Sequence, residues 1–210
     1  MEIIPVINCA EFECVTERAK KAEAFAEWVH LDVSDARFTF GKSWGDAEAW
    51  KEIGKGINTE VHLMVEEPEK VVEQWFEAGA KRLIVHIETI NKNSFKEIAD
   101  AAKKYDAELM LAISPETPVE KLKPYFEIVS EFQVLAVHAG PAGQNFLPFA
   151  LDKIRFLRRE LPNAIIEVDG GINLETAKQV KDAGADIMTA ATYIFRSDNP
   201  AAAYDELRGI

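Results

Sequence analysis

Two histidines and two aspartates in this 210-residue chain have the types and spacing of a metal centre that also moves protons. His30 and Asp32 are two residues apart in one apolar run, so on a β-strand both side chains point to the same face. His62 ends a second such run and Asp169 ends a third. Two imidazoles and two carboxylates suit one divalent first-row cation, which we expect to be Zn²⁺, Fe²⁺, Mn²⁺ or Co²⁺.

The two carboxylates of this set also suit acid–base chemistry at a carbon next to a carbonyl. If Asp32 and Asp169 lie on opposite walls, one can take a proton from one face of the carbon. The other can then return a proton to the opposite face, which inverts the centre. A cation between them would polarise the carbonyl and hold the enediolate that forms. We therefore expect Asp32 and Asp169 to be catalytic as well as metal-binding.

Each of these residues has a simpler explanation when it is taken alone. A His-x-Asp pair on one strand is commonly a structural hydrogen bond, and an aspartate before two glycines commonly forms a turn. The interpretation as a site depends on convergence, because all four histidines are expected at the downstream ends of strands. We expect His86 and His138 to line the site rather than to bind the cation, with a hydrogen bond to a ligand as an alternative for His86.

The elements that must position these residues alternate strand and helix eight times. Helix signals are clear in 67–78, which has Pro68 in its first turn, and in 173–183, where Asn173 is a plausible N-cap and Gly184 follows the end. Strands separated by helices pair in parallel, which predicts one (β/α)₈ barrel domain over residues 1–210. An open doubly wound sheet is less favoured, because no Gly-x-Gly-x-x-Gly follows the first strand. The expected strands begin near Glu2, Glu27, Asn58, Arg82, Ala107, Glu131, Ala164 and Asp186.

Several residues near the expected rim could contact a substrate. Met64 shares the inward face of His62 and is expected to line the site, although core packing explains it equally well. Gly170-Gly171 precede a helix start, which is a standard anion site in barrels. Gly140 and Gly143 follow the sixth strand and could supply further backbone N–H groups. Tight turns are the alternative for both glycine pairs.

Composition limits the partners of the protein. The formal net charge of −12 argues against nucleic acid and anionic membranes, which need basic surface. No apolar run approaches the ~20 residues of a membrane span, and we see no signal peptide. We expect Cys9 and Cys14 to be free thiols in a reducing, cytoplasmic environment.

The motifs, taken in order, are similar to those of the ribulose-phosphate 3-epimerase family over nearly the whole chain. These motifs include His30-Leu31-Asp32-Val33, Val61-His62-Leu63-Met64-Val65, Val85-His86-Ile87-Glu88 and Ile166-Glu167-Val168-Asp169-Gly170-Gly171-Ile172-Asn173. The resemblance implies a metal-dependent isomerase of the pentose phosphate pathway. It implies interconversion of D-ribulose 5-phosphate and D-xylulose 5-phosphate at carbon 3, with Asp32 and Asp169 as the acid–base pair. It also suggests a homo-oligomer.

The chain departs from the family pattern where phosphate would be held. Ala191-Thr192 replace the usual Gly-Ser after the eighth strand, Pro141 stands in the sixth-strand loop, and Val6 replaces a serine. These changes leave two alternatives open: the same chemistry on another ketose, or a non-catalytic sugar- or metal-binding relative. The expected substrate-binding residues are Met64, His86, Gly140, Gly143, Gly170, Gly171, Ala191 and Thr192.

Overall fold

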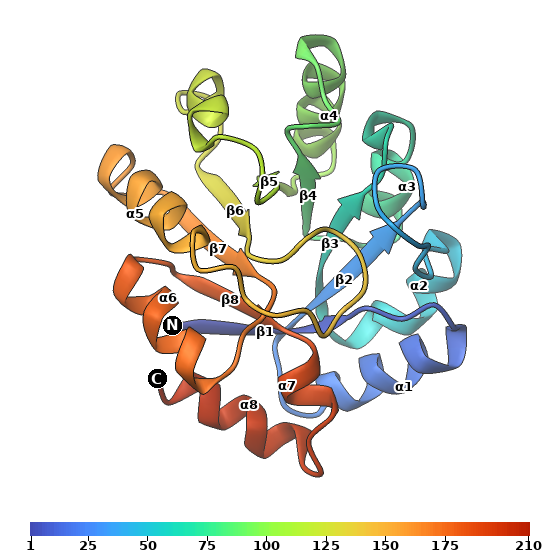
Figure 1. The fold of residues 1–210 in the computed structure, drawn as a ribbon. Coiled ribbons are helices and arrows are strands. Elements are labelled where there is room, and N and C mark those ends of the chain that lie inside the picture. Colours follow the sequence, from blue (N-terminus) through green and yellow to red (C-terminus); the bar gives the residue numbers. More distant parts are fainter.

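The computed structural model describes all residues from 1 to 210 and contains a closed parallel barrel (Figure 1). Its eight strands follow one another around the ring in sequence order, and β1 pairs with β8 to close it. The prediction of a (β/α)₈ barrel is confirmed. The strands are β1 (Glu2–Ile7), β2 (Trp28–Ser34), β3 (Asn58–Met64), β4 (Arg82–His86), β5 (Glu108–Ile113), β6 (Glu131–Leu135), β7 (Ile165–Asp169) and β8 (Ile187–Ala190).

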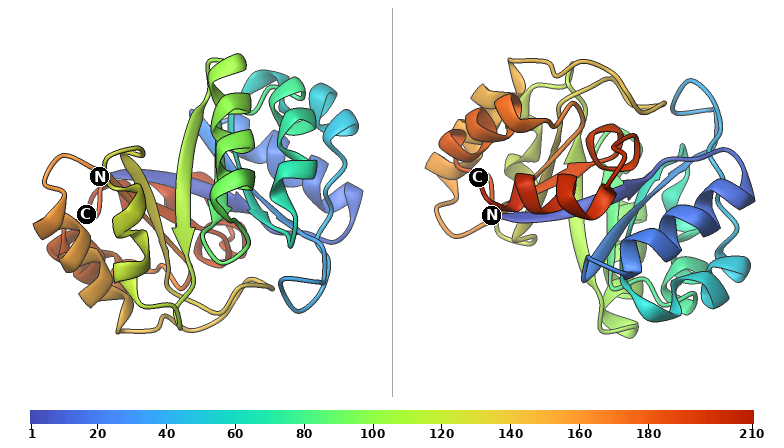
Figure 2. Two further views of the ribbon diagram at one scale, coloured as in Figure 1. Left: turned by 90° about the horizontal axis from the view of Figure 1, so that it is seen from above. Right: turned by 90° about the horizontal axis from the view of Figure 1, so that it is seen from below.

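The helices surround the strands on the outside of the barrel, as Figures 1 and 2 show. The expected caps are present on α6, where Asn173 accepts hydrogen bonds from two backbone N–H groups and Gly184 ends the helix in the left-handed conformation. The α-helices are α1 (Phe12–Glu23), α2 (Ala47–Ile53), α3 (Val72–Glu77), α4 (Lys92–Lys104), α5 (Ala150–Glu160), α6 (Leu174–Ala183), α7 (Thr192–Phe195) and α8 (Pro200–Arg208).

Two of the expected helical segments differ from the sequence-based prediction. The segment expected over 67–78 begins as a 3₁₀ turn, η2 (Pro68–Lys70), before α3 starts at Val72. After β5 the chain forms the 3₁₀ helix η3 (Val119–Tyr125), and η1 (Gly54–Gly56) extends α2. Pro124 lies inside η3, where a missing N–H and a fixed φ disfavour continuous α-helix.

Alternate residues of each strand face two different environments. Residues such as Leu31, Leu63 and Val168 point outward and belong to the main hydrophobic core of 49 residues between barrel and helices. Inside the barrel Ile84, Met110 and Ala112 form a small apolar cluster. The rest of the interior is more polar than the branched aliphatic layers usual in this fold.

A network of buried polar side chains fills much of the barrel interior. Glu60 accepts from Arg82 Nη1 at 2.6 Å and is bonded to His30 Nδ1 at 2.6 Å, while Gln133 Nε2 donates to Glu167 Oε1 at 2.9 Å. Glu167 Oε2 and Gln133 Oε1 have no hydrogen-bond partner. Burial, and then the nearby Glu60 charge, raise the pKa of Glu167 well above its ordinary value, so the neutral acid is favoured.

Glu167→Gln is expected to stabilise the metal-free protein at neutral pH. A carboxyl whose folded-state pKa is raised loses stability as pH rises above its unfolded value, and an amide does not titrate. The amide also supplies a donor near Gln133, so we expect a gain on the order of 1–3 kcal/mol. Denaturant titrations in chelator at pH 5 and pH 8 measure it. A variant as stable as wild type at pH 8 would show that the buried Glu167 carboxyl does not lower the folding stability.

Cys9 and Cys14 form a disulfide, so the expectation of free thiols is wrong. Cys9 follows the end of β1, and Cys14 lies in the first turn of α1. The short connection holds their Cα atoms 6.0 Å apart, which is within bridging range.

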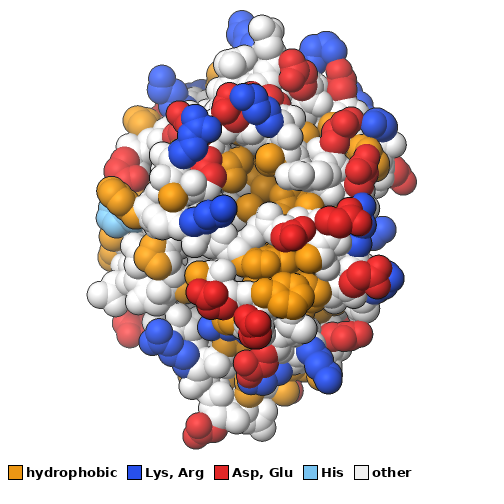
Figure 3. Space-filling view, turned by 90° about the vertical axis from the view of Figure 1, so that its right-hand side faces the viewer, with side chains coloured by type: hydrophobic (Ala, Val, Ile, Leu, Met, Phe, Trp, Pro, Cys, Tyr) orange, Lys and Arg blue, Asp and Glu red, His pale blue; other side chains and the backbone are white.

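The outer surface carries charges of both signs. Figure 3 shows one flank on which Lys and Arg side chains are interspersed with Asp and Glu around a smaller apolar area. None of the helices is both long and apolar enough to cross a bilayer.

Candidate metal centre and active site

The four ligands predicted from the sequence meet inside the barrel. His30 and Asp32 lie in β2, His62 in β3 and Asp169 at the end of β7, and all four are buried. One potential ligand atom from each lies within 4.8 Å of every other. Asp32 Oδ1 is 3.2 Å from His30 Nε2 and 3.1 Å from His62 Nδ1, and Asp169 Oδ2 is 3.5 Å from His62 Nδ1. Two nitrogens and two carboxylate oxygens at this spacing fit one divalent cation.

Strand register explains why these side chains converge. Asp32 of β2 pairs directly with His62 of β3, which places them side by side. His30 and Asp32 share the inward face of the same strand. The histidines His30 and His62 lie within their strands rather than at the ends, since β2 continues to Ser34 and β3 to Met64. The expectation that each histidine ends its strand therefore holds only for His86.

Each carboxylate is held by a neutral donor through the oxygen that faces away from the histidines. Asn8 Nδ2 donates to Asp32 Oδ2 at 2.8 Å, and Thr189 Oγ1 donates to Asp169 Oδ1 at 2.5 Å. Asn8 directly follows β1, which pairs with β2, and Thr189 lies in β8, which pairs with β7. These contacts leave Asp32 Oδ1 and Asp169 Oδ2 directed toward the shared site.

The imidazoles are also oriented from behind. His30 uses Nδ1 for Glu60, so its Nε2 faces the ligand cluster. His62 has the opposite arrangement, with Nδ1 toward the cluster and Nε2 at 2.9 Å from His86 Nε2. His86 Nδ1 in turn lies 3.2 Å from Glu88 Oε2. Such outer hydrogen bonds fix which nitrogen is available to a cation.

His86 is thus the residue for which the sequence left two roles open, and the geometry favours the hydrogen bond to a ligand. Its ring is fully buried and it is not part of the cavity lining. Burial and the charge of His62 lower its pKa, although Glu88 acts in the opposite direction, so the ring is neutral. The hydrogen bond with His86 helps to hold the pKa of Glu88 down at about 2, against the effect of burial. The contact of His86 with substrate stays a prediction.

Binding of a divalent cation is expected to release protons near neutral pH. Burial lowers the pKa of His30, but hydrogen bonds to Asp32 and Glu60 outweigh it and leave this pKa well above the ordinary value. The metal-free imidazole is therefore protonated, and a cation must displace that proton. Affinity should rise with pH by up to tenfold per unit for each proton released. Calorimetry at pH 7 in two buffers of different ionisation enthalpy counts the protons, and a count of zero would contradict this.

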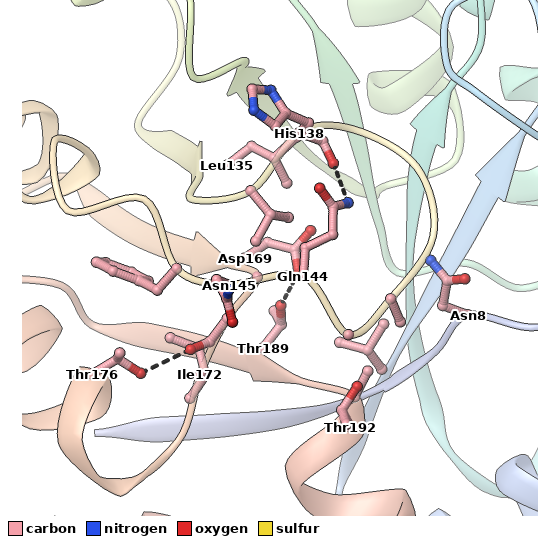
Figure 4. A pocket seen from close by; sticks show the side chains of 18 of the residues that line it. Asn8, Leu135, His138, Gln144, Asn145, Asp169, Ile172, Thr176, Thr189 and Thr192 are labelled. Carbon is pink, nitrogen blue, oxygen red and sulfur yellow. Dashed lines mark hydrogen bonds between the residues drawn. The ribbon is translucent and has the colours of Figure 1, made fainter.

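A cavity of about 510 Å³ opens beside the ligand cluster (Figure 4). Asp32 and Asp169 reach it, and so do seven of the eight expected substrate-binding residues, all except His86. The cavity contains no Lys or Arg among its lining residues. Those seven are Met64, Gly140, Gly143, Gly170, Gly171, Ala191 and Thr192.

Anion binding in this cavity would depend on backbone N–H groups. The helix start after Gly170-Gly171 is already capped, because Asn173 accepts from the N–H groups of Glu175 and Thr176. The N–H groups of Gly171, Ala191 and Thr192 have no acceptor within the chain and line the same cavity. The N–H groups at the start of α6 are therefore partly used by the Asn173 cap. The N–H groups of Gly171, Ala191 and Thr192 are the better candidates for anion binding.

Sequence reasoning missed several residues that orient the site. Asn8, Glu60 and Thr189 contact the ligands directly but carry no motif of their own. Glu60 had a usable signal, because it precedes His62 by two residues and so shares its inward face. His138 lies beyond the end of β6, is exposed and pairs with Glu116 at 2.5 Å, while it still lines the cavity rim.

The barrel and its buried His–Asp cluster define an α/β-barrel enzyme with a site at one mouth. The family model described as "Ribulose-phosphate 3 epimerase family" matches residues 2–195. Ribulose-phosphate 3-epimerase of Chlamydia muridarum is 35% identical over 210 residues, covering 94% of this chain and 89% of the relative. The enzyme of that name from Schizosaccharomyces pombe is 35% identical over 187 residues, covering 87% and 81%. The chain belongs to the ribulose-phosphate 3-epimerase family, whose named members are isomerases.

A solved structure supports the architecture independently. A 3-hexulose-6-phosphate synthase superposes with a TM-score of 0.77 and covers 100% of this chain and 99% of its own, at 19% sequence identity. At that identity the likeness establishes the fold alone.

Proposed function

We propose that the protein interconverts D-ribulose 5-phosphate and D-xylulose 5-phosphate by moving a proton at carbon 3. The observation that carries this proposal is the meeting of Asp32 and Asp169, from β2 and β7, at one buried cluster with two imidazoles. Family membership supports the sugar-phosphate class of substrate. The same four residues would hold one divalent cation, with zinc, iron, manganese and cobalt all compatible with the ligand set.

In this proposal the chain's own residues do the proton transfer. Asp32 and Asp169 face the substrate from different sides, one removing the carbon 3 proton and the other supplying a proton to the opposite face. When bound, the cation would polarise the adjacent carbonyl and stabilise the enediolate. Met64, which is buried beside the cavity, excludes water from that position. Asn8 and Thr189 keep each carboxylate aimed at the reacting carbon.

The phosphate would be held by the N–H groups of Gly171, Ala191 and Thr192. A second candidate substrate, another ketose or ketose phosphate, is favoured by a specific observation. Pro141 has no N–H to donate and Ala191 carries a Cβ, so the backbone surface differs from the glycine-rich pattern of the family. A cytoplasmic location and self-association remain predictions from the sequence.

The test is hydrogen–deuterium exchange at carbon 3 of D-ribulose 5-phosphate in heavy water, with metal-reconstituted protein. Exchange together with formation of D-xylulose 5-phosphate would support the proposal. Comparison with unphosphorylated ribulose and a hexulose 6-phosphate separates the two candidate substrates. If kcat/KM for ribulose 5-phosphate does not exceed that for the other sugars, the second candidate is correct. Absence of exchange with every sugar would favour a non-catalytic binding protein.

A further inference from the structure

Asn8 joins two parts of the site that are far apart in the sequence. It lies just past the end of β1 and lines the cavity (Figure 4). Its Nδ2 donates to Asp32 Oδ2 at 2.8 Å and to the carbonyl oxygen of Gly140 at 3.1 Å. The backbone carbonyl oxygen of Asn8 accepts a hydrogen bond from Arg18 Nη1 of α1 at 3.3 Å, which anchors the backbone at this position. Both hydrogens of one amide group are therefore committed, one to a proposed catalytic carboxylate and one to a loop.

That loop, residues 136–149, crosses the barrel mouth between β6 and α5 (Figure 1). Leu147 N–H donates to Ala136 at 2.8 Å and closes its base. Gln144 Nε2 braces its middle by donating to the carbonyl oxygens of His138 at 2.7 Å and Pro141 at 3.0 Å. Residues 137–146 all line the cavity. The loop is thus braced internally and covers the site as a unit.

Two polar side-chain contacts tie the middle of this loop to other elements. One is the Asn8–Gly140 hydrogen bond, and the other is the contact between His138 Nδ1 and Glu116 Oε1. Both side chains of this second contact are exposed, at 63% and 62%, and exposed pairs contribute little to stability. Asn8 is partly buried and anchored at its backbone, so its hydrogen bond is the stronger tie.

The Asp32 carboxylate turns as a rigid group, so fixing Oδ2 also fixes the direction of Oδ1 toward His30 and His62. We propose that Asn8 is a positioning residue that couples closure of the 136–149 loop to the orientation of Asp32, an inference that rests on the proposed function of that site. With the loop in place the amide is held by two acceptors. With the loop displaced it has one, and Asp32 loses its fixed direction. Thr189 holds Asp169 in a similar way but makes no hydrogen bond to the loop, so the coupling concerns Asp32.

The test compares Asn8→Ala with variants that affect only one side of the coupling. Hydrogen–deuterium exchange of the Leu147 N–H, which donates to Ala136 O at the loop base, reports on the loop in the metal-free protein. The kcat and KM for D-ribulose 5-phosphate report on Asp32 in the metal-loaded enzyme. We expect Asn8→Ala to lower kcat about 10- to 100-fold, as loss of an outer hydrogen bond does at metal sites. Loop exchange should become about 2- to 10-fold faster, which corresponds to one lost hydrogen bond. KM should change less than kcat.

The controls separate coupling from a simple structural role. Glu116→Gln removes the exposed loop tie and should leave both readouts within about twofold of wild type. Thr189→Val should lower kcat without changing loop exchange. Asn8→Gln, which keeps the donor group, should recover part of both effects. An Asn8→Ala variant that changes only kcat or only loop exchange would overturn the coupling. If wild type fails to epimerise, the proposed function falls, while loop exchange and cation affinity still report on Asn8.

Discussion

Asp169→Asn is expected to stop epimerisation while leaving proton exchange on one epimer. Asparagine keeps the size of the side chain and can still pair with Thr189 Oγ1, but it cannot take or give the carbon 3 proton. General acid–base groups typically contribute 10²- to 10⁴-fold, so kcat for interconversion should fall about 10³-fold. Asp32 remains on the other side, so one epimer should still exchange its proton with deuterium at a measurable rate. Nuclear magnetic resonance of each epimer in heavy water, at saturating cation, measures both quantities.

The reciprocal variant makes this prediction specific. Asp32→Asn should preserve exchange on the opposite epimer and lose interconversion in the same way. Asp152→Asn on the outer helix α5 changes an exposed aspartate far from the cavity and should behave as wild type. If Asp169→Asn interconverts the epimers at more than about a tenth of the wild-type rate, the two-base mechanism is wrong.

His62→Gln is expected to remove most of the bound cation. His62 contributes one of four ligand atoms and lies between Asp32 and Asp169, so its loss opens the middle of the cluster. Metal content should fall from about one divalent ion per chain to a small fraction, with affinity at least about 100-fold weaker. Elemental analysis after gel filtration and competition with a chromogenic chelator measure these changes.

A series of histidine variants provides graded controls for the same measurement. His86→Gln removes the hydrogen bond behind His62 and the contact with Glu88 but none of the four proposed ligand atoms, so we expect affinity to fall about 10- to 100-fold. His138→Gln changes an exposed histidine and should leave metal content unchanged. Equal metal retention in the His62 and His138 variants would show that the cluster is not the cation site.

The barrel and its four central residues could be predicted from the sequence because both follow from simple periodicities. Parallel pairing follows from strands that alternate with helices, and the two-residue spacing of His30 and Asp32 places both side chains on one face. Asp169 could be included because the chain continues into two glycines where the seventh strand must end. The resemblance to a family added the substrate and reaction to this geometry.

The residues that orient the site could not be predicted in the same way. Asn8 meets Asp32 and Gly140 only through tertiary structure, across 24 and 132 positions of sequence. The Cys9–Cys14 bridge depends on the shape of one short connection, and composition indicated free thiols instead. The cap at Asn173 was expected as a helix signal, but its occupation of N–H groups near the anion site became clear only from the hydrogen bonds.

Three of the proposed ligands lie on the longest strand ladder, where β2 and β3 pair in register from Trp28–Asn58 to Ser34–Met64. The fourth, Asp169, lies across the ring on β7. A cation held by all four would therefore link β2 and β3 to β7 across the barrel interior. Such a cation binds the folded chain in preference to the unfolded one. A free cation concentration of 100 times the dissociation constant would therefore add about 2.7 kcal/mol to folding stability. The folding stability of the barrel would then depend on the concentration of free cation around it.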